Sequence, residues 1–129
     1  MLYYAKGEDM KILVAEDMAS VRMVFKDILV NHCQFPQKDI FFANDGNEAV
    51  AEYSKIKPDI VFLDILMPRL DGKGALRQIM KMDPNAYVLM CSSAIETIAE
   101  CMYEGAIGYV AKPLTPDGVR KAIEKFKDR

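Results

Sequence analysis

Short apolar segments alternate with amphipathic segments five times along the 129 residues of this chain. The apolar segments are four or five residues long, which is typical of strands, and are expected at residues 11–15, 39–43, 60–63, 87–91 and 108–111. In the amphipathic segments, apolar residues recur three and four positions apart, a spacing that predicts helices. Because a helix follows each strand, the pattern predicts an α/β domain with a doubly wound parallel sheet and right-handed crossovers.

Several residues indicate where the expected helices begin. The first helix is expected over residues 20–31. Asp45 and Glu48 form a capping box at the start of the second helix. Thr115, followed by proline and aspartate, is an N-cap for the fifth helix. Residues 60–63 are apolar at every position, as expected for a strand that is buried on both faces.

The length of the chain fits one domain with its own hydrophobic core. We expect residues 1–9 to form a flexible leader and residues 10–129 to form the folded domain. Since the chain ends directly after the fifth helix, we expect no attached output domain.

Composition narrows the classes of partner. The formal net charge is −2 with acids and bases interspersed, so a broad basic surface for nucleic acid is not expected. No apolar run approaches the roughly 20 residues that span a bilayer, and the N-terminus lacks the apolar core of a signal peptide. We therefore predict a cytoplasmic protein that binds no membrane. Cys33, Cys91 and Cys101 lack metal-type spacing, which indicates reduced core thiols.

Charged and hydroxyl side chains follow four of the five expected strands. Glu16 and Asp17 follow the first strand, Asp64 follows the third, Ser92 follows the fourth and Lys112 follows the fifth. The carboxyl ends of parallel strands meet at one edge of an open sheet, and ligands bind there. These five residues therefore predict one site.

Three carboxylates in one site repel one another, and a divalent cation relieves that repulsion. Oxygen ligands without histidine or cysteine favour Mg²⁺. We expect Asp17 and Asp64 to bind Mg²⁺ directly, Glu16 to bind it through water, and the backbone carbonyl of Leu66 to complete the protein ligands. The alternative is that Glu16 and Asp17 only cap the first helix.

Lys112 can pair with Asp64 or with an anion bound beside it. The anion that suits both Mg²⁺ and a lysine is a phosphoryl group, whose transfer depends mainly on positioning and charge neutralisation. Asp64 is then the nucleophile, because carboxylates form acyl phosphates. The bond before Pro113 can be cis, as X–Pro bonds permit.

With these residues in place, the chain resembles the receiver domains of two-component response regulators, and in particular the single-domain, chemotaxis-type (CheY-like) regulators. The resemblance spans residues 10–127 and implies a flavodoxin-like (βα)5 fold with strand order 2-1-3-4-5. The matching motifs are Ile12-Leu13-Val14-Ala15-Glu16-Asp17, Asp45-Gly46, Asp64 with Met67-Pro68 and Asp71-Gly72, Ser92, Gly105-Ala106, and Tyr109 with Lys112-Pro113.

The resemblance implies a role for each site residue. Asp64 would accept a phosphoryl group from a phosphohistidine on a sensor histidine kinase or a phosphotransfer protein, while the acids after the first strand hold Mg²⁺. Lys112 would contact the phosphoryl group, Ser92 would be the switch hydroxyl, and Tyr109 would be the aromatic residue that rotates inward.

The resemblance also implies a signalling switch rather than an enzyme acting on another substrate. Such a protein catalyses its own phosphoryl transfer and its slow dephosphorylation. The fourth helix, fifth strand and fifth helix would form the face that binds a downstream target, such as a motor or a relay component. A phosphatase is a further expected partner.

Two departures from the family pattern lie near the fourth strand. A second serine, Ser93, stands where the family usually has alanine, so placing Ala94 directly after the switch hydroxyl would select Ser93 instead. The spacing from Asp64 favours Ser92. The span from Ser92 to Gly105 is also shorter than usual, which affects the shape of the output face.

The positions two residues after Asp64 and two after Ser92 are Leu66 and Ala94, and neither side chain is polar. Few side chains are then available to orient an attacking water. We therefore expect a long-lived aspartyl phosphate.

Two other function classes use a similar sheet. A Mg²⁺-dependent hydrolase of the aspartyl-phosphate type would carry a second acid two residues after Asp64, where this chain has Leu66. A flavodoxin-like cofactor binder would have a Gly/Ser/Thr-rich first loop, whereas Glu16 and Asp17 would repel a phosphate unless a metal intervened. The residues argue against both classes.

Overall fold

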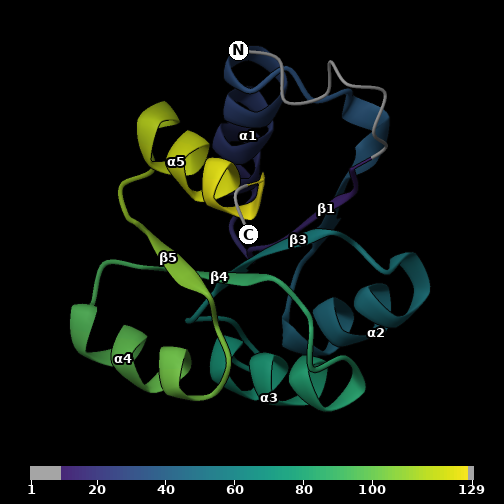
Figure 1. Cartoon of the computed structure of the whole chain (residues 1–129), viewed down its shortest axis with the longest axis vertical. Coiled ribbons are helices and arrows are strands. Elements are labelled where there is room, and N and C mark those ends of the chain that lie inside the picture. Colours follow the sequence, from purple (N-terminus) through teal and green to yellow (C-terminus); the bar gives the residue numbers. More distant parts are fainter. Residues whose placement is uncertain (1–9, 128–129) are drawn as a thin grey trace.

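The structure is a computed structural model that describes residues 10–127, so the expected leader, residues 1–9, lies outside the described residues. Five parallel strands form one sheet in the order β2-β1-β3-β4-β5, which confirms the flavodoxin-like order (Figure 1). The strands are β1 (Ile12–Ala15), β2 (Ile40–Ala43), β3 (Ile60–Asp64), β4 (Val88–Ser92) and β5 (Gly108–Ala111).

Helices cover both faces of the sheet. Two of them, α1 and α5, lie on one face, while α2, α3 and α4 lie on the other (Figure 1). This is the doubly wound arrangement predicted from the alternation of strands and helices. The bounds are α1 (Ala19–Asp27), α2 (Gly46–Ile56), α3 (Gly72–Met82), α4 (Ile95–Tyr103) and α5 (Pro116–Lys127).

Each strand feeds two separate cores, because successive side chains point to opposite faces. Ile12 and Val14 of β1 belong to the cluster under α1 and α5. Leu13 belongs to the cluster under α2, α3 and α4. In the first cluster, the rings of Phe25 and Phe62 lie 5.3 Å apart between centroids. This two-sided burial explains why residues 12–15 of β1 and residues 60–63 of β3 are all apolar.

The first helix differs from the prediction in its last turn. It is α-helical only to Asp27, and Ile28–His32 continues as a wider π-helical turn. The N–H of Cys33 donates to the carbonyl of Ile28, five residues earlier, which is the hydrogen bond of a π-helix. A π-helical turn has no residue signature comparable to a cap, so the prediction of one continuous helix over 20–31 was wrong in this detail.

The predicted helix caps are present. Asp45 accepts the N–H of Glu48 at 2.8 Å, and Glu48 reaches back to the N–H of Asn44 at 3.1 Å. Thr115 accepts the N–H of Gly118 at 3.0 Å. These contacts set where α2 and α5 begin, and the start of α2 borders the loop after β3.

The three cysteines are buried and unpaired, as predicted. Burial raises the pKa of the Cys33 thiol to about 11, and burial also raises the pKa of the Cys91 thiol. They are therefore inert core side chains rather than reactive thiols. Within residues 10–127, none of the helices combines the length and the apolar character needed to cross a membrane.

Candidate functional site

The strand register brings the predicted site residues to one edge of the sheet. Ala15 of β1 pairs with Leu63 of β3, so Glu16 lies beside Asp64. Ser92 of β4 pairs with Ala111 of β5, so Lys112 lies next to Ser92. Residues as far apart in sequence as 16 and 112 thus meet where strands β1, β3, β4 and β5 end.

Lys112 joins the two buried acids of the site. Its Nζ lies 3.0 Å from Glu16 Oε1 and 3.0 Å from Asp64 Oδ1. Glu16 is 1% exposed and Asp64 is 5% exposed. The lysine is itself partly buried, so the three groups interact in a region with little water.

Burial and hydrogen bonding shift the pKa values of Glu16 and Lys112 in opposite directions. Burial raises the pKa of Glu16, and the hydrogen bond from Lys112 offsets only part of that effect. For Lys112, burial alone would lower the pKa, but the hydrogen bonds and charges of Glu16 and Asp64 outweigh it, so the pKa is raised. Lys112 therefore stays protonated, while the Glu16 carboxylate still lacks full charge compensation.

Glu16, Asp17 and Asp64 form an acid cluster that could hold a metal ion. One carboxylate oxygen of each lies within 4.8 Å of the other two. Asp17 is exposed, whereas the other two acids are buried. A hard divalent cation fits this donor set, because the set is all oxygen and its negative charge exceeds that of the single Lys112 ammonium.

The alternative role of the acids as caps of α1 is only partly seen. The N-cap position of α1 is Met18, and no side chain caps it there. Glu16 Oε2 does accept the Met18 N–H at 3.2 Å, but its other oxygen faces Lys112. Glu16 thus supports the start of the helix and contributes to the cluster at the same time.

A cavity of about 340 Å³ opens over Asp64. The Ser92 hydroxyl lies on its wall and accepts the N–H of Ala94 at 2.9 Å. Ser93 lines the cavity as well, so proximity alone does not separate the two serines. The lining residues are Asp17, Met18, Asp64, Ile65, Leu66, Ser92, Ser93, Ala94, Thr97 and Lys112.

Thr97 is a cavity residue that the sequence interpretation missed. Its hydroxyl donates to the carbonyl of Ala94 at 2.8 Å, within the first turn of α4. The shortened span after Ser92 was a usable signal, since it places the first turn of α4 close to the end of β4. Thr97 is thus a polar side chain in a wall that also contains Leu66 and Ala94.

Tyr109 and Pro113 complete the predicted residues. Tyr109 is half exposed and lines a separate hollow between β5 and α5, so the structure does not bring it into the cavity over Asp64. The Lys112–Pro113 peptide bond is cis.

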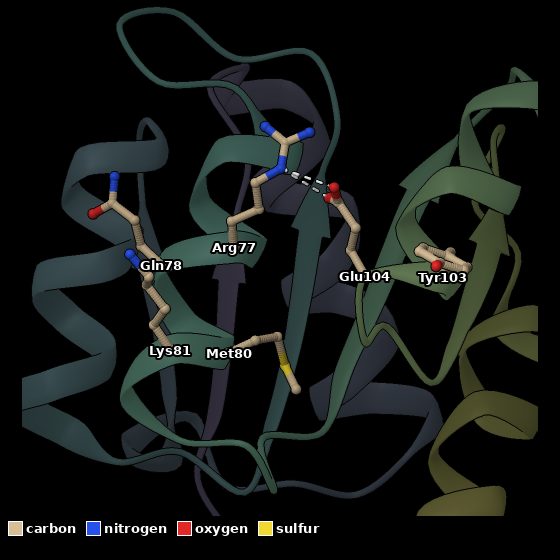
Figure 2. Close-up of a pocket in the computed structure, with 6 residues that line it drawn as sticks. All are labelled: Arg77, Gln78, Met80, Lys81, Tyr103 and Glu104. Atoms are coloured by element: carbon tan, nitrogen blue, oxygen red, sulfur yellow. Dashed lines mark hydrogen bonds and ion pairs between the residues drawn. The ribbon is translucent and has the colours of Figure 1, made fainter.

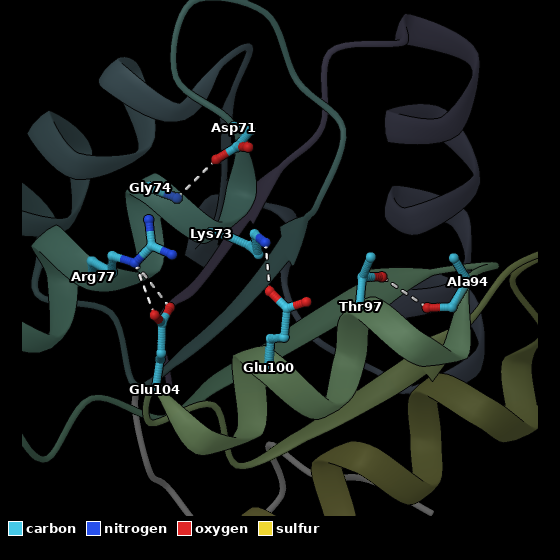
Figure 3. A network of polar contacts seen from close by, with 8 residues as sticks. All are labelled: Asp71, Lys73, Gly74, Arg77, Ala94, Thr97, Glu100 and Glu104. Atoms are coloured by element: carbon cyan, nitrogen blue, oxygen red, sulfur yellow. Dashed lines mark hydrogen bonds and ion pairs between the residues drawn. The ribbon is translucent and has the colours of Figure 1, made fainter.

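A larger hollow of about 540 Å³ lies between α3 and the end of α4, and Figure 2 shows its lining residues. Two ion pairs connect these helices beside it: Lys73 Nζ to Glu100 Oε2 at 2.7 Å, and Arg77 Nε to Glu104 Oε1 at 2.9 Å (Figure 3). These pairs are largely exposed, so each contributes little stability alone. The two pairs link α3 to α4 and include none of the acids of the cluster around Asp64.

Comparison with known proteins gives a consistent family. Residues 12–124 match the response regulator receiver domain. Chemotaxis protein CheY of Thermotoga maritima is 37% identical over 117 residues, covering 89% of this chain and 95% of that protein. Chemotaxis protein CheY of Listeria monocytogenes is 40% identical over 118 residues, covering 90% and 97%.

Solved structures agree with the sequence relatives. A chain in the crystal structure of the CheX-CheY-BeF3-Mg+2 complex from Borrelia burgdorferi matches with a TM-score of 0.86 at 31% identity. The match covers 96% of this chain and 93% of that one.

Proposed function

The chain belongs to the response regulator receiver domain family, and from this we propose that it is a stand-alone, CheY-type phosphoacceptor switch that receives a phosphoryl group on Asp64. Receiver domains are signalling switches, so the expected product of the reaction is the altered protein itself rather than a released compound. The proposed donor is a phosphohistidine on a sensor histidine kinase or a phosphotransfer protein.

The observation that carries this proposal is the position of Lys112 between Glu16 and Asp64. A carboxylate at the floor of a cavity is open to a phosphoryl group from outside. The ammonium group lies within hydrogen-bond distance of the same carboxylate, so it would also lie close to the phosphoryl oxygens. Few other reactions need a carboxylate, a lysine and an acid cluster in this arrangement.

The proposed transfer is a displacement at phosphorus. An oxygen of Asp64 forms the new bond to phosphorus while the bond from phosphorus to the donor's imidazole nitrogen breaks, and that nitrogen keeps the electron pair. Mg²⁺, when bound by Asp17, Asp64, the Leu66 carbonyl and, through water, Glu16, would neutralise charge on the phosphoryl oxygens. Lys112 would pair with one of these oxygens.

The proposed switch begins with the charge added to Asp64. The Ser92 hydroxyl, which now accepts the Ala94 N–H, would turn to donate to a phosphoryl oxygen. This rotation would break the hydrogen bond from the Ala94 N–H and so release the start of α4. Tyr109 would then move inward from its half-exposed position. The population then shifts toward a form whose α4-β5-α5 face binds a downstream protein.

We propose action in the cytoplasm, with a kinase, a downstream target and a phosphatase as partners. The buried, unpaired cysteines suit a reducing compartment. A motor protein and a relay component are both compatible as the target, because the residues of the site are the same for either.

The test is phosphorylation by acetyl phosphate with and without Mg²⁺, followed by mass spectrometry of the intact protein. The unaltered protein should gain one phosphoryl group only when Mg²⁺ is present, and Asp64→Asn should gain none. Asp59→Asn is the matched control, because Asp59 directly precedes β3, at the end opposite Asp64, and is exposed. It should react like the unaltered protein.

Failure of the unaltered protein to gain a phosphoryl group in Mg²⁺ would defeat the proposal. Equal labelling of Asp64→Asn would show that another residue is the acceptor. Beryllofluoride, a phosphoryl mimic, provides a second measurement: spectra of the unaltered protein should change on its addition with Mg²⁺, whereas those of Asp64→Asn should not.

A further inference from the structure

An ion pair ties the loop after Asp64 to the start of α2. Arg69 Nε lies 2.6 Å from Asp45 Oδ2, and the Asp45 side chain is only 9% exposed. The other oxygen of that carboxylate, Oδ1, accepts the N–H of Glu48. One buried carboxylate therefore caps α2 and holds the guanidinium of the neighbouring loop.

The backbone beside this ion pair is tightly constrained. Arg69 has φ of 67°, a left-handed conformation that side chains with a Cβ rarely adopt. The next carbonyl, that of Leu70, accepts the N–H of Gly46 at 3.0 Å. A Cβ at position 46 would lie 2.0 Å from that carbonyl oxygen, so only glycine lets the two backbones approach this closely. The turn around Arg69 is thus pressed against α2.

The rest of the loop is fixed at its base. The N–H of Gly72 donates to the carbonyl of Ile65 at 2.8 Å, and the N–H of Ile65 donates to the carbonyl of Cys91 at 3.3 Å. Met67 is buried, but the Leu66 side chain is 80% exposed. The position of the Leu66 carbonyl is therefore set by the backbone on either side of it rather than by packing of its own side chain.

We propose that Asp45 and Arg69 form a clamp that positions the Leu66 carbonyl for Mg²⁺ binding beside Asp64. This inference rests on the proposed function, since it assigns these two residues to the same site. Mg²⁺ requires near-octahedral ligands at short distances, so a loop that moves freely binds it more weakly. Asp45 and Arg69 are positioning residues that act through the loop backbone and touch neither the metal nor the phosphoryl group.

Two substitutions separate the clamp from its surroundings. Arg69→Gly removes the guanidinium but suits the left-handed backbone, and Asp45→Asn removes the charge but keeps an oxygen that can cap α2. Arg77→Ala is the matched control, because it removes the ion pair to Glu104 between α3 and α4, away from the cluster.

The experiment is calorimetric titration of each variant of the whole chain with Mg²⁺, together with hydrogen exchange, without metal, of the backbone amides of Leu66, Met67, Arg69 and Leu70. Both clamp variants should bind Mg²⁺ about tenfold more weakly, as is typical when a group that orients a ligand is lost. Their loop amides should exchange faster. Arg77→Ala should match the unaltered protein in both measurements.

Unchanged Mg²⁺ affinity in Arg69→Gly would overturn the clamp and leave the proposed function standing. An equal loss of affinity in Arg77→Ala would also overturn it, because the effect would then belong to any lost ion pair. No Mg²⁺ binding by the unaltered protein would overturn the proposed function, and the clamp with it.

Discussion

Lys112 and Asp64 are 48 residues apart in sequence, yet the Nζ of the lysine lies 3.0 Å from Oδ1 of the aspartate. The same ammonium is 3.0 Å from Glu16 Oε1. One cation is thus shared by two buried acids, and any anion that reaches Asp64 competes for it. In the proposed switch, this competition would transmit a modification of Asp64 to β5, the strand that precedes Lys112.

Lys112→Ala is expected to retain phosphoryl transfer to Asp64 but to lose the conformational response to it. Phosphoryl transfer from acetyl phosphate should become slower but still occur, because Asp64 and the acids proposed to bind Mg²⁺ remain. The spectral change in α4 and β5 on phosphorylation should be lost. NMR of the labelled protein measures this, with Lys73→Ala as a control that removes a surface ion pair instead. A normal response in Lys112→Ala would refute the role of the lysine.

Ser92→Ala should impair the response more than Ser93→Ala. Ser92 lies at the end of β4, and its hydroxyl already holds the Ala94 N–H, so its movement alters the start of α4 directly. Ser93 is exposed. The beryllofluoride-induced NMR shifts of α4 in the two variants measure the difference. The opposite ranking would mean that Ser93 is the switch hydroxyl.

Leu66→Asn should shorten the lifetime of the phosphorylated protein, because an amide at this position can orient an attacking water. Stability should change by less than about 0.5 kcal/mol, since the side chain is exposed. The decay of the isolated phosphoprotein gives the rate, with Met23→Asn as the control at an exposed position on α1. Decay of the unaltered phosphoprotein within seconds would contradict the expected long lifetime.

Asp45 should make the free energy of unfolding depend on pH in the acid range. The N–H of Glu48 and then the Arg69 guanidinium hold the pKa of the Asp45 carboxyl below its ordinary value of 3.8. The folded protein thus favours the ionised form, so this stabilisation is present above the ordinary pKa and is lost as the pH falls through the lowered one.

Asp45→Asn should accordingly be less stable than the unaltered protein at about pH 7, and the two should converge toward about pH 2. Thermal unfolding as a function of pH measures both curves. A stability difference that stays constant over this range would mean that Asp45 does not contribute through its charge.

Gly72→Ala should cost stability, because the new Cβ would lie 2.2 Å from the carbonyl oxygen of Asp64, which is rigid backbone. We expect a loss of about 2 kcal/mol or more from this overpacking. Gly74→Ala is the matched control in the same helix: its Cβ meets the end of the Leu70 side chain, which can rotate away. Urea unfolding should show that only the first change is costly, and similar losses in both would contradict this reading.

The fold and the acid cluster were predictable because their signals are local. The apolar runs specify strands, and the acids follow them directly, so the topology alone brings Glu16 and Asp64 together. The boundaries were less accurate: Ser92 was expected after the fourth strand but continues it, since pairing with Ala111 extends the ladder by one residue. Sequence pattern does not show where a ladder loses its last hydrogen bond.

The missing parts depend on contacts between exposed or distant residues. Arg69 reads as an ordinary loop arginine, and its partner Asp45 is 24 positions earlier in a helix cap. Thr97 reads as a polar residue in a helix, and only the closeness of α4 to β4 places it in the cavity. Tyr109 was assigned by resemblance, and its inward movement stays a prediction.

Leu66 stands at the mouth of the cavity with 80% of its surface in solvent. In the proposed transfer, a protein that brings its histidine to Asp64 would contact this leucine as well. Full burial of such a side chain is worth about 1.5–3 kcal/mol, so Leu66 would strengthen the encounter with the phosphodonor. Leu66, whose side chain cannot orient an attacking water in the isolated protein, would thus add affinity in the complex with the phosphodonor. Changes at position 66 should therefore alter phosphate lifetime and kinase recognition together.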